Sequence, residues 1–159
     1  MRKDSRGFSL IELLIVVAII LIIAAIAIPN LLKSRIAANQ ASAVGSLRTI
    51  DTAEIEYAST YNTGFSPTLA ALGPPASGTE TASAAGVIDS VLAGGTKAGY
   101  SFVYSTTAST GGRYDTYTIN ANPVTVGTTG TNYYFTDQTA TIRQNSTAAA
   151  SASDSPIGG

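Results

Sequence analysis

Few residues in this sequence could carry out chemistry, and one of them stands in an unexpected place. The 159-residue chain has neither cysteine nor histidine, which removes thiolate nucleophiles, disulfides, Cys/His metal sites and the most common general base. Glu12 is an acid in an otherwise apolar stretch that runs to Ile28. Because a carboxylate near a hydrocarbon core costs about 2.5 to 3.5 kcal/mol, some interaction must offset the placement of Glu12.

Two further acids, Asp115 and Asp137, fall on or beside segments that read as strands. No histidine, cysteine or phosphate-binding glycine loop accompanies them, so the sequence predicts neither an enzyme nor a cofactor. Asp137 also stands apart from other acids, which leaves too few ligands for a calcium ion. We therefore expect no catalytic residue and no metal site.

Composition divides the chain into two unlike parts. Residues 13–28 contain no polar residue, whereas the chain beyond about residue 60 is rich in Gly, Ser, Thr and Ala. The length suits one globular domain with an appendage. Three bases, Arg2, Lys3 and Arg6, lie in the first seven residues, and the net charge of the whole chain is −1. Nothing in this distribution indicates a nucleic-acid partner.

The apolar stretch is long enough to cross a membrane. As a helix, residues 10–28 would measure about 28 Å, close to the thickness of a hydrocarbon core of about 30 Å. The preceding bases predict a cytoplasmic N-terminus and place the chain after Pro29 on the far side. The alternative is a secretory signal that is cleaved after Ala27, so that Ile28 begins the mature protein.

Residues 7–12, GFSLIE, resemble the processing motif of type IV prepilins and type II secretion pseudopilins. The basic leader before them, the apolar helix after them and Pro29 at its end complete the resemblance, which is close over residues 6 to about 32. It implies that a prepilin peptidase cuts after Gly7 and that the new N-terminus, Phe8, is methylated. It also implies storage in the inner membrane and assembly into a homopolymer by inner-membrane machinery.

The cut would create an ammonium at Phe8, one helical turn before Glu12. The two groups could pair within one chain, because positions i and i+4 share a helix face. The resemblance implies instead that Glu12 of an incoming subunit meets the Phe8 amine of an assembled one. Such a pair would form only in the correct register and could thereby specify assembly.

The pattern predicts an α+β, pilin-like fold with a long bent N-terminal helix. The leader is residues 1–7, and the first half of the helix, residues 8–30, is the transmembrane or assembly half. The second half, residues 31–61, is amphipathic, because apolar residues recur in it every seven positions, at Ile36, Ala43, Ile50 and Tyr57. Pro29 should bend or locally open this helix, or else end it. A connecting region, residues 62–99, contains two short helical candidates, residues 66–73 with Ser66 as the cap and residues 87–93.

Beyond residue 99 the hydrophobic period changes to two. Residues 100–105, 114–120, 132–136 and 140–143 read as strands, so residues 100–144 predict an antiparallel meander of about three or four strands with one face on the helix. The tail, residues 145–159, is Ser/Ala/Gly-rich, and we expect it to be flexible or to form a loosely held strand.

Three functions remain open at this point. The favoured one is the major subunit of an extracellular type IV pilus. The second is the major pseudopilin of a type II secretion system, whose filament stays in the periplasm. The third, of another class, is a membrane-anchored or secreted binding module that never polymerises.

Overall fold

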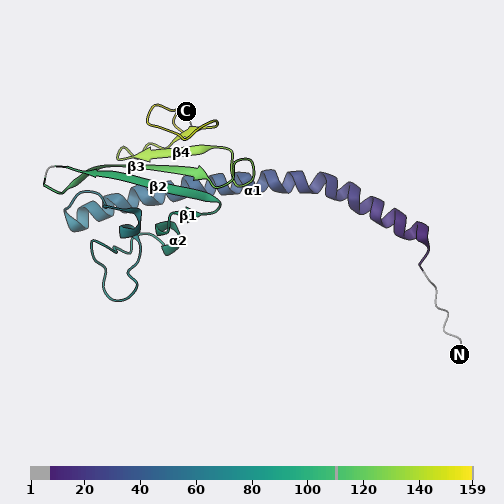
Figure 1. The fold of residues 1–159 in the computed structure, drawn as a ribbon, viewed down its shortest axis with the longest axis horizontal. Coiled ribbons are helices and arrows are strands. Elements are labelled where there is room, and N and C mark those ends of the chain that lie inside the picture. Colours follow the sequence, from purple (N-terminus) through teal and green to yellow (C-terminus); the bar gives the residue numbers. More distant parts are fainter. Residues whose placement is uncertain (1–7, 110, 159) are drawn as a thin grey trace. The chain divides into compact units, whose positions relative to one another are not determined.

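The computed structural model describes residues 8–109 and 111–158 (Figure 1). By its contacts the chain divides into two compact units, with the boundary after Arg35. We describe each unit by itself. Gly7 and the rest of the predicted leader lie outside the described residues.

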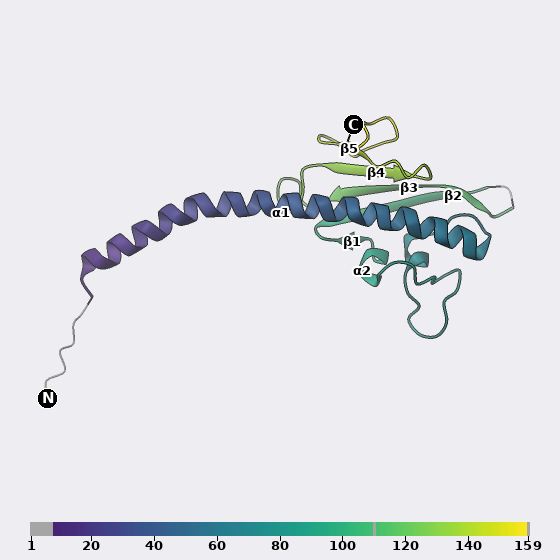
Figure 2. The ribbon, with the colours of Figure 1, turned by 180° about the vertical axis from the view of Figure 1, so that it is seen from behind.

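The first element is α1, an α-helix over Leu10–Tyr61. Its end at Tyr61 is where the sequence predicted it. In the second unit, one face of α1 is buried, and it includes Ala43, Ile50 and Tyr57 of the predicted seven-residue repeat. Leu47 and Ala53 complete the apolar part of this face, whereas Ile36, the first member of the repeat, is only half-buried. This face packs with apolar residues of the sheet in one core cluster, and both ribbon views show the sheet lying along this part of α1 (Figure 2).

The sheet contains five antiparallel strands in sequence order. They are β1 Thr96–Lys97, β2 Tyr100–Ala108, β3 Tyr114–Pro123, β4 Tyr133–Asp137 and β5 Arg143–Asn145. The predicted α+β fold is confirmed, with one strand more than expected because β1 pairs two residues with the start of β2. The sequence predicted the last strand over residues 140–143, but β5 begins only at Arg143. Its position is set by pairing with β4, in which Tyr133 lies opposite Asn145.

The connecting region forms two single turns. A 3₁₀ helix over Leu69–Leu72 is capped by Thr68, whose side chain accepts from the backbone N–H of Ala71, and α2 over Ser90–Ala93 is capped by Asp89. The predicted cap at Ser66 is therefore wrong. Ser66 is fully buried and bonds to α1 instead, so its hydroxyl is not at the start of a helix.

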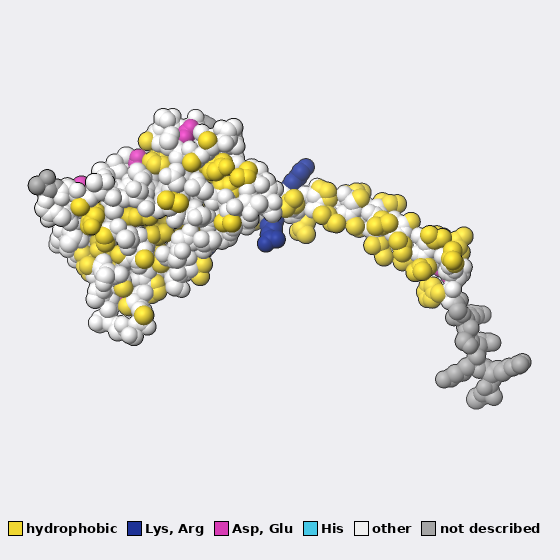
Figure 3. Space-filling view, in the orientation of Figure 1, with side chains coloured by type: hydrophobic (Ala, Val, Ile, Leu, Met, Phe, Trp, Pro, Cys, Tyr) yellow, Lys and Arg dark blue, Asp and Glu magenta, His cyan; other side chains and the backbone are white. Residues whose placement is uncertain are grey.

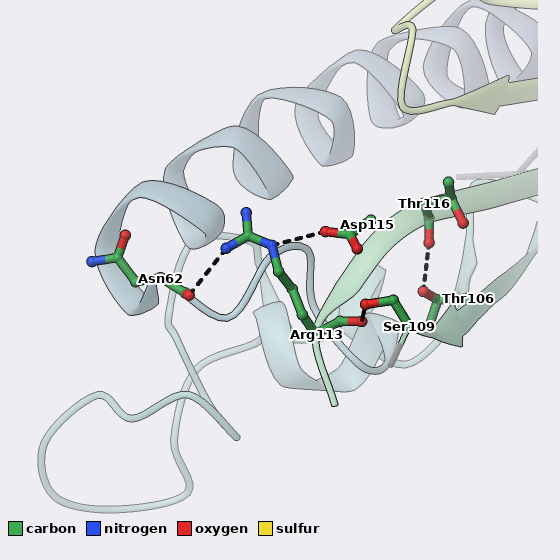
Figure 4. A network of polar contacts seen from close by, with 6 residues as sticks. All are labelled: Asn62, Thr106, Ser109, Arg113, Asp115 and Thr116. Atoms are coloured by element: carbon green, nitrogen blue, oxygen red, sulfur yellow. Dashed lines mark hydrogen bonds and ion pairs between the residues drawn. The ribbon is translucent and has the colours of Figure 1, made fainter. Parts of the chain in front are cut away.

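The end of α1 is tied to the hairpin between β2 and β3. The backbone N–H of Phe65 donates to the carbonyl of Tyr114 across 2.7 Å. At the hairpin, Arg113 forms an ion pair with Asp115 and its guanidinium reaches the carbonyl of Asn62 (Figure 4). Gly64 sits in this connection with φ of +83°, and a side chain there would collide with the Tyr114 carbonyl.

The tail forms backbone hydrogen bonds with the last strand of the sheet. The N–H of Gln144 donates to the carbonyl of Ser155, and the N–H of Ile157 donates to the carbonyl of Ile142, so the end of the chain pairs with the edge of β5. Asp154 accepts bonds from Asn145 and Ser151. These bonds agree with the expected alternative of a loosely held strand, and Ile157 packs against the core cluster while Ala150 is buried.

Candidate functional site

The first unit presents an uncovered apolar helix. Its large apolar side chains between Phe8 and Leu32 are exposed, so each needs apolar surroundings that the chain itself does not provide. These side chains are Phe8, Leu10, Ile11, Leu13, Leu14, Ile15, Val16, Val17, Ile19, Ile20, Leu21, Ile22, Ile23, Ile26, Ile28, Leu31 and Leu32. The space-filling view shows hydrophobic side chains along this part of α1 (Figure 3). By length and composition, α1 includes a segment that could cross a membrane.

Glu12 caps the start of its own helix in the structure. The backbone N–H of Ser9 donates to Glu12 Oε2 across 2.9 Å, and the N–H of Leu13 donates to the carbonyl of Ser9. Residues 9–12, S-x-x-E, have the sequence of a capping box, and the Ser9–Glu12 bond is one of its two bonds. The Glu12 side chain is thus bonded to the backbone at the start of the apolar segment, where Phe8 is 85% exposed.

Pro29 lies inside α1 and does not end it. Because proline has no N–H, the carbonyl of Ala25 loses its helical donor at this point. The helix is continued by Leu31 and Leu32 and then by two exposed bases, Lys33 and Arg35. The apolar segment is therefore bounded by charged residues on its C-terminal side as well.

The acids on the sheet do not converge. Asp115 pairs with Arg113 across 2.8 Å, while Asp137 closes a turn by accepting from the N–H and hydroxyl of Thr139. Within residues 8–109 and 111–158, no three or more His, Cys, Asp or Glu side chains gather into a potential metal site. Each of these acids is engaged in a local contact of the sheet or of its turns.

Two buried carboxylates were missed by the sequence reasoning. Asp51 accepts from the hydroxyl of Tyr117 across 2.9 Å and from that of Thr136 across 3.1 Å. Glu54 bonds to the backbone N–H of Ser66 across 2.8 Å and lies 2.6 Å from the Ser66 hydroxyl. A signal was present, because both acids fall on the i, i+3, i+4 stripe that also carries the apolar core residues of α1.

Burial raises the pKa of both acids. Loss of solvent raises the pKa of the Asp51 carboxyl, against the lowering effect of its bonds from Tyr117 and Thr136. Burial likewise raises the pKa of the Glu54 carboxyl, and the negative charge of Asp51 acts in the same direction. Both acids attach the amphipathic half of α1 to the sheet and to the loop after the helix.

Comparison with known proteins places the strongest likeness at the N-terminus. Residues 2–28 match the family described as "Prokaryotic N-terminal methylation motif". This match includes Gly7, Phe8 and Glu12, which the sequence pattern singled out. The segment is thus a methylation-motif segment like those of type IV pilins, as predicted.

Two curated relatives share this region. The chain is 54% identical over 50 residues, 31% of its length, to the "Type IV major pilin protein PilA" of Myxococcus xanthus. It is 62% identical over 37 residues, 23% of its length, to the "Type IV wide pilus major component PilA4" of Thermus thermophilus. The matches span 23% and 28% of those relatives, about a quarter of each. No solved structure matches the chain.

Proposed function

We propose that this chain, whose N-terminal segment carries the prokaryotic methylation motif, is the major structural subunit of an extracellular type IV pilus. The observation that carries the proposal is the joining of that motif to an uncovered apolar helix, which continues as α1 into an α+β unit. An apolar helix that its own chain leaves exposed requires lipid or other copies of itself. A subunit that is stored in a membrane and later polymerised uses both environments in turn.

Processing begins at the junction between Gly7 and Phe8. A prepilin peptidase removes the basic leader and the new amine of Phe8 is methylated. Before assembly the protein is a single-pass inner-membrane protein with a cytoplasmic N-terminus, because three bases precede the apolar segment and two, Lys33 and Arg35, follow it. The inner-membrane assembly machinery then transfers the subunit into the filament.

Assembly buries the apolar segments of many copies against one another. In that environment an unpaired Glu12 carboxylate would be costly, and the Phe8 ammonium of a neighbouring subunit is its counter-charge. Pro29 provides a point at which the helix can open during this packing, since the Ala25 carbonyl already lacks its donor. No catalytic activity and no cofactor are required for this role.

The experiment that tests this function isolates the assembled material. Filaments sheared from the surface of the native organism should consist mainly of this chain, and deletion of its gene should remove them. A chain that stays in the periplasm, with loss of enzyme secretion on deletion, would indicate a type II pseudopilin instead. The naming of both relatives as major type IV pilus components supports the pilus over that alternative.

A further inference from the structure

We propose that Glu54 is an uncharged carboxylic acid in the folded protein at neutral pH, and that it donates its hydrogen to the hydroxyl of Ser66. Glu54 and Ser66 are both 0% exposed. They lie on different elements, α1 and the loop that follows it, so their contact fixes the path of the chain as it leaves the helix. The proposal concerns the second unit and does not depend on assembly into a pilus.

The number of hydrogens at Ser66 favours this protonation state. Ser66 Oγ lies 2.6 Å from Glu54 Oε1, 3.1 Å from the carbonyl of Thr68 and 3.2 Å from Tyr104 Oη. Its single hydrogen can serve only one of these oxygens. The hydroxyl of Tyr104 donates to the backbone carbonyl of Ser66 across 2.8 Å, so its own hydrogen is already used.

An ionised Glu54 would take the hydrogen of Ser66, so that it reaches neither Tyr104 Oη nor the Thr68 carbonyl, which also accepts from the N–H of Ala71 across 3.1 Å. A neutral Glu54 donates to Ser66 Oγ, and the Ser66 hydroxyl then donates onward to Thr68 or Tyr104. The second bond, from the backbone N–H of Ser66 to Glu54 Oε2 across 2.8 Å, is kept in both states. The neutral acid therefore completes one more hydrogen bond in a site from which water is excluded.

Glu54 also faces the negative charge of Asp51, which opposes its ionisation. From α1 it faces Asp51 and Tyr57, from β2 Tyr104 and from β3 Tyr117. The ion pairs among the described residues join Lys97 to Asp89 and Arg113 to Asp115, so neither includes a buried acid of α1. Burying a carboxylate without a cation is unfavourable, and a second acid one helical turn away increases the cost.

Asp51 is the better place for whatever negative charge the pair retains. Its oxygens accept from two hydroxyls, Tyr117 and Thr136, both of which stabilise the ionised form. Glu54 has two hydroxyl neighbours, Ser66 and Tyr104, and the hydrogen of Tyr104 is directed to the carbonyl of Ser66 across 2.8 Å. Raising the pH removes the proton of Glu54, places two negative charges one turn apart inside the core, and weakens the attachment of the loop and of β2 to α1.

The direct test is a pH titration of the full chain in detergent micelles with ¹³C-labelled glutamate carboxyls. The chain has four glutamates, Glu12, Glu54, Glu56 and Glu80, so the signals can be assigned by single Gln substitutions. The exposed Glu56 provides a second signal from the same helix, and the ordinary pKa of a free glutamate side chain is about 4.3. The Glu54 signal should remain that of a protonated acid through pH 7, and its titration at the ordinary value would overturn the proposal.

Thermal unfolding of the full chain gives an independent readout. The unfolding temperature of the unmodified protein should fall as the pH rises from about 4.3, the ordinary pKa of glutamate in the unfolded chain, toward the raised pKa of Glu54 in the folded protein, and Glu54→Gln should reduce this fall. Glu56→Gln, a matched change at an exposed position of the same helix, should not. An equal fall in Glu54→Gln and the unmodified protein would contradict the proposal; if Glu54→Gln does not fold, the titration of the unmodified protein decides alone.

Discussion

The backbone N–H of Ser9 donates to Glu12 Oε2 across 2.9 Å, so the carboxylate that we propose to meet a neighbouring amine also caps its own helix. These two roles place different demands on the side chain. A cap requires only an acceptor oxygen, whereas pairing with an ammonium requires the negative charge. Substitutions that keep one property and remove the other can separate them.

Glu12→Gln keeps an acceptor for the Ser9 N–H and removes the charge, and Glu12→Val removes both. We expect both variants to insert into the membrane. Losing one partner of a buried charge pair costs about 2 to 5 kcal/mol, so subunit association should weaken by more than about tenfold in each. The measurement is the filament yield relative to the membrane-inserted pool. Normal yield from Glu12→Gln would show that capping alone matters.

Tyr117→Phe should destabilise the second unit by removing a donor to the buried Asp51. A hydrogen bond to a charged group contributes about 1.5 to 3 kcal/mol, so the free energy of unfolding should fall by about that amount. Denaturant unfolding of the full chain in detergent provides the measurement. Tyr133→Phe is the control, since the Tyr133 hydroxyl has no hydrogen bond to the described residues, and it should change the free energy by less than about 0.5 kcal/mol.

Alanine substitutions at two glycines can distinguish the stability cost of backbone strain from the cost of a steric collision. Gly64 and Gly78 both have positive φ, +83° and +90°, but a Cβ at Gly64 would strike the Tyr114 carbonyl while one at Gly78 meets nothing. Gly78→Ala should cost about 1 to 2 kcal/mol from strain alone. Gly64→Ala should cost about 1 to 3 kcal/mol more, because the chain must also shift. Equal costs in thermal unfolding would argue against the close connection between α1 and β3.

Alkaline pH should destabilise the sheet through Tyr100. Its hydroxyl is buried and donates to the carbonyl of Asn132 across 2.8 Å, and burial raises its pKa to about 12. Because the unfolded side chain ionises near pH 10, its contribution to stability is complete below pH 10 and is lost as the pH rises toward 12. Unfolding measured across this range should show a smaller decline in Tyr100→Phe. An unchanged decline would assign the effect to other groups.

The sequence predicted the elements whose side chains repeat regularly. The seven-residue spacing of Ala43, Ile50 and Tyr57 identified the buried face of α1, and alternation identified the cores of β2, β3 and β4. The two-residue strand β1 shows no such alternation. The last strand, Arg-Gln-Asn, is polar and is defined by its pairing with β4, which local pattern does not reveal.

The polar contacts of the interior were the part that local reasoning missed. Ser66 has the sequence context of a helix cap, yet its hydroxyl turns to Glu54, twelve positions earlier. Asp51 was not expected in the core, because its partners Tyr117 and Thr136 are more than sixty positions away. The motif around Gly7, Phe8 and Glu12 was readable because all of its information is local.

The central claim is most directly tested by mass spectrometry of the N-terminal peptide of the mature protein from native cells. The account predicts a chain that begins at Phe8 and carries one methyl group on its amine. The same peptide should be found in the membrane pool and in sheared filaments. A mature chain that begins at Ile28 with an unmodified amine would contradict the account, since it would lack both the Phe8 ammonium and Glu12.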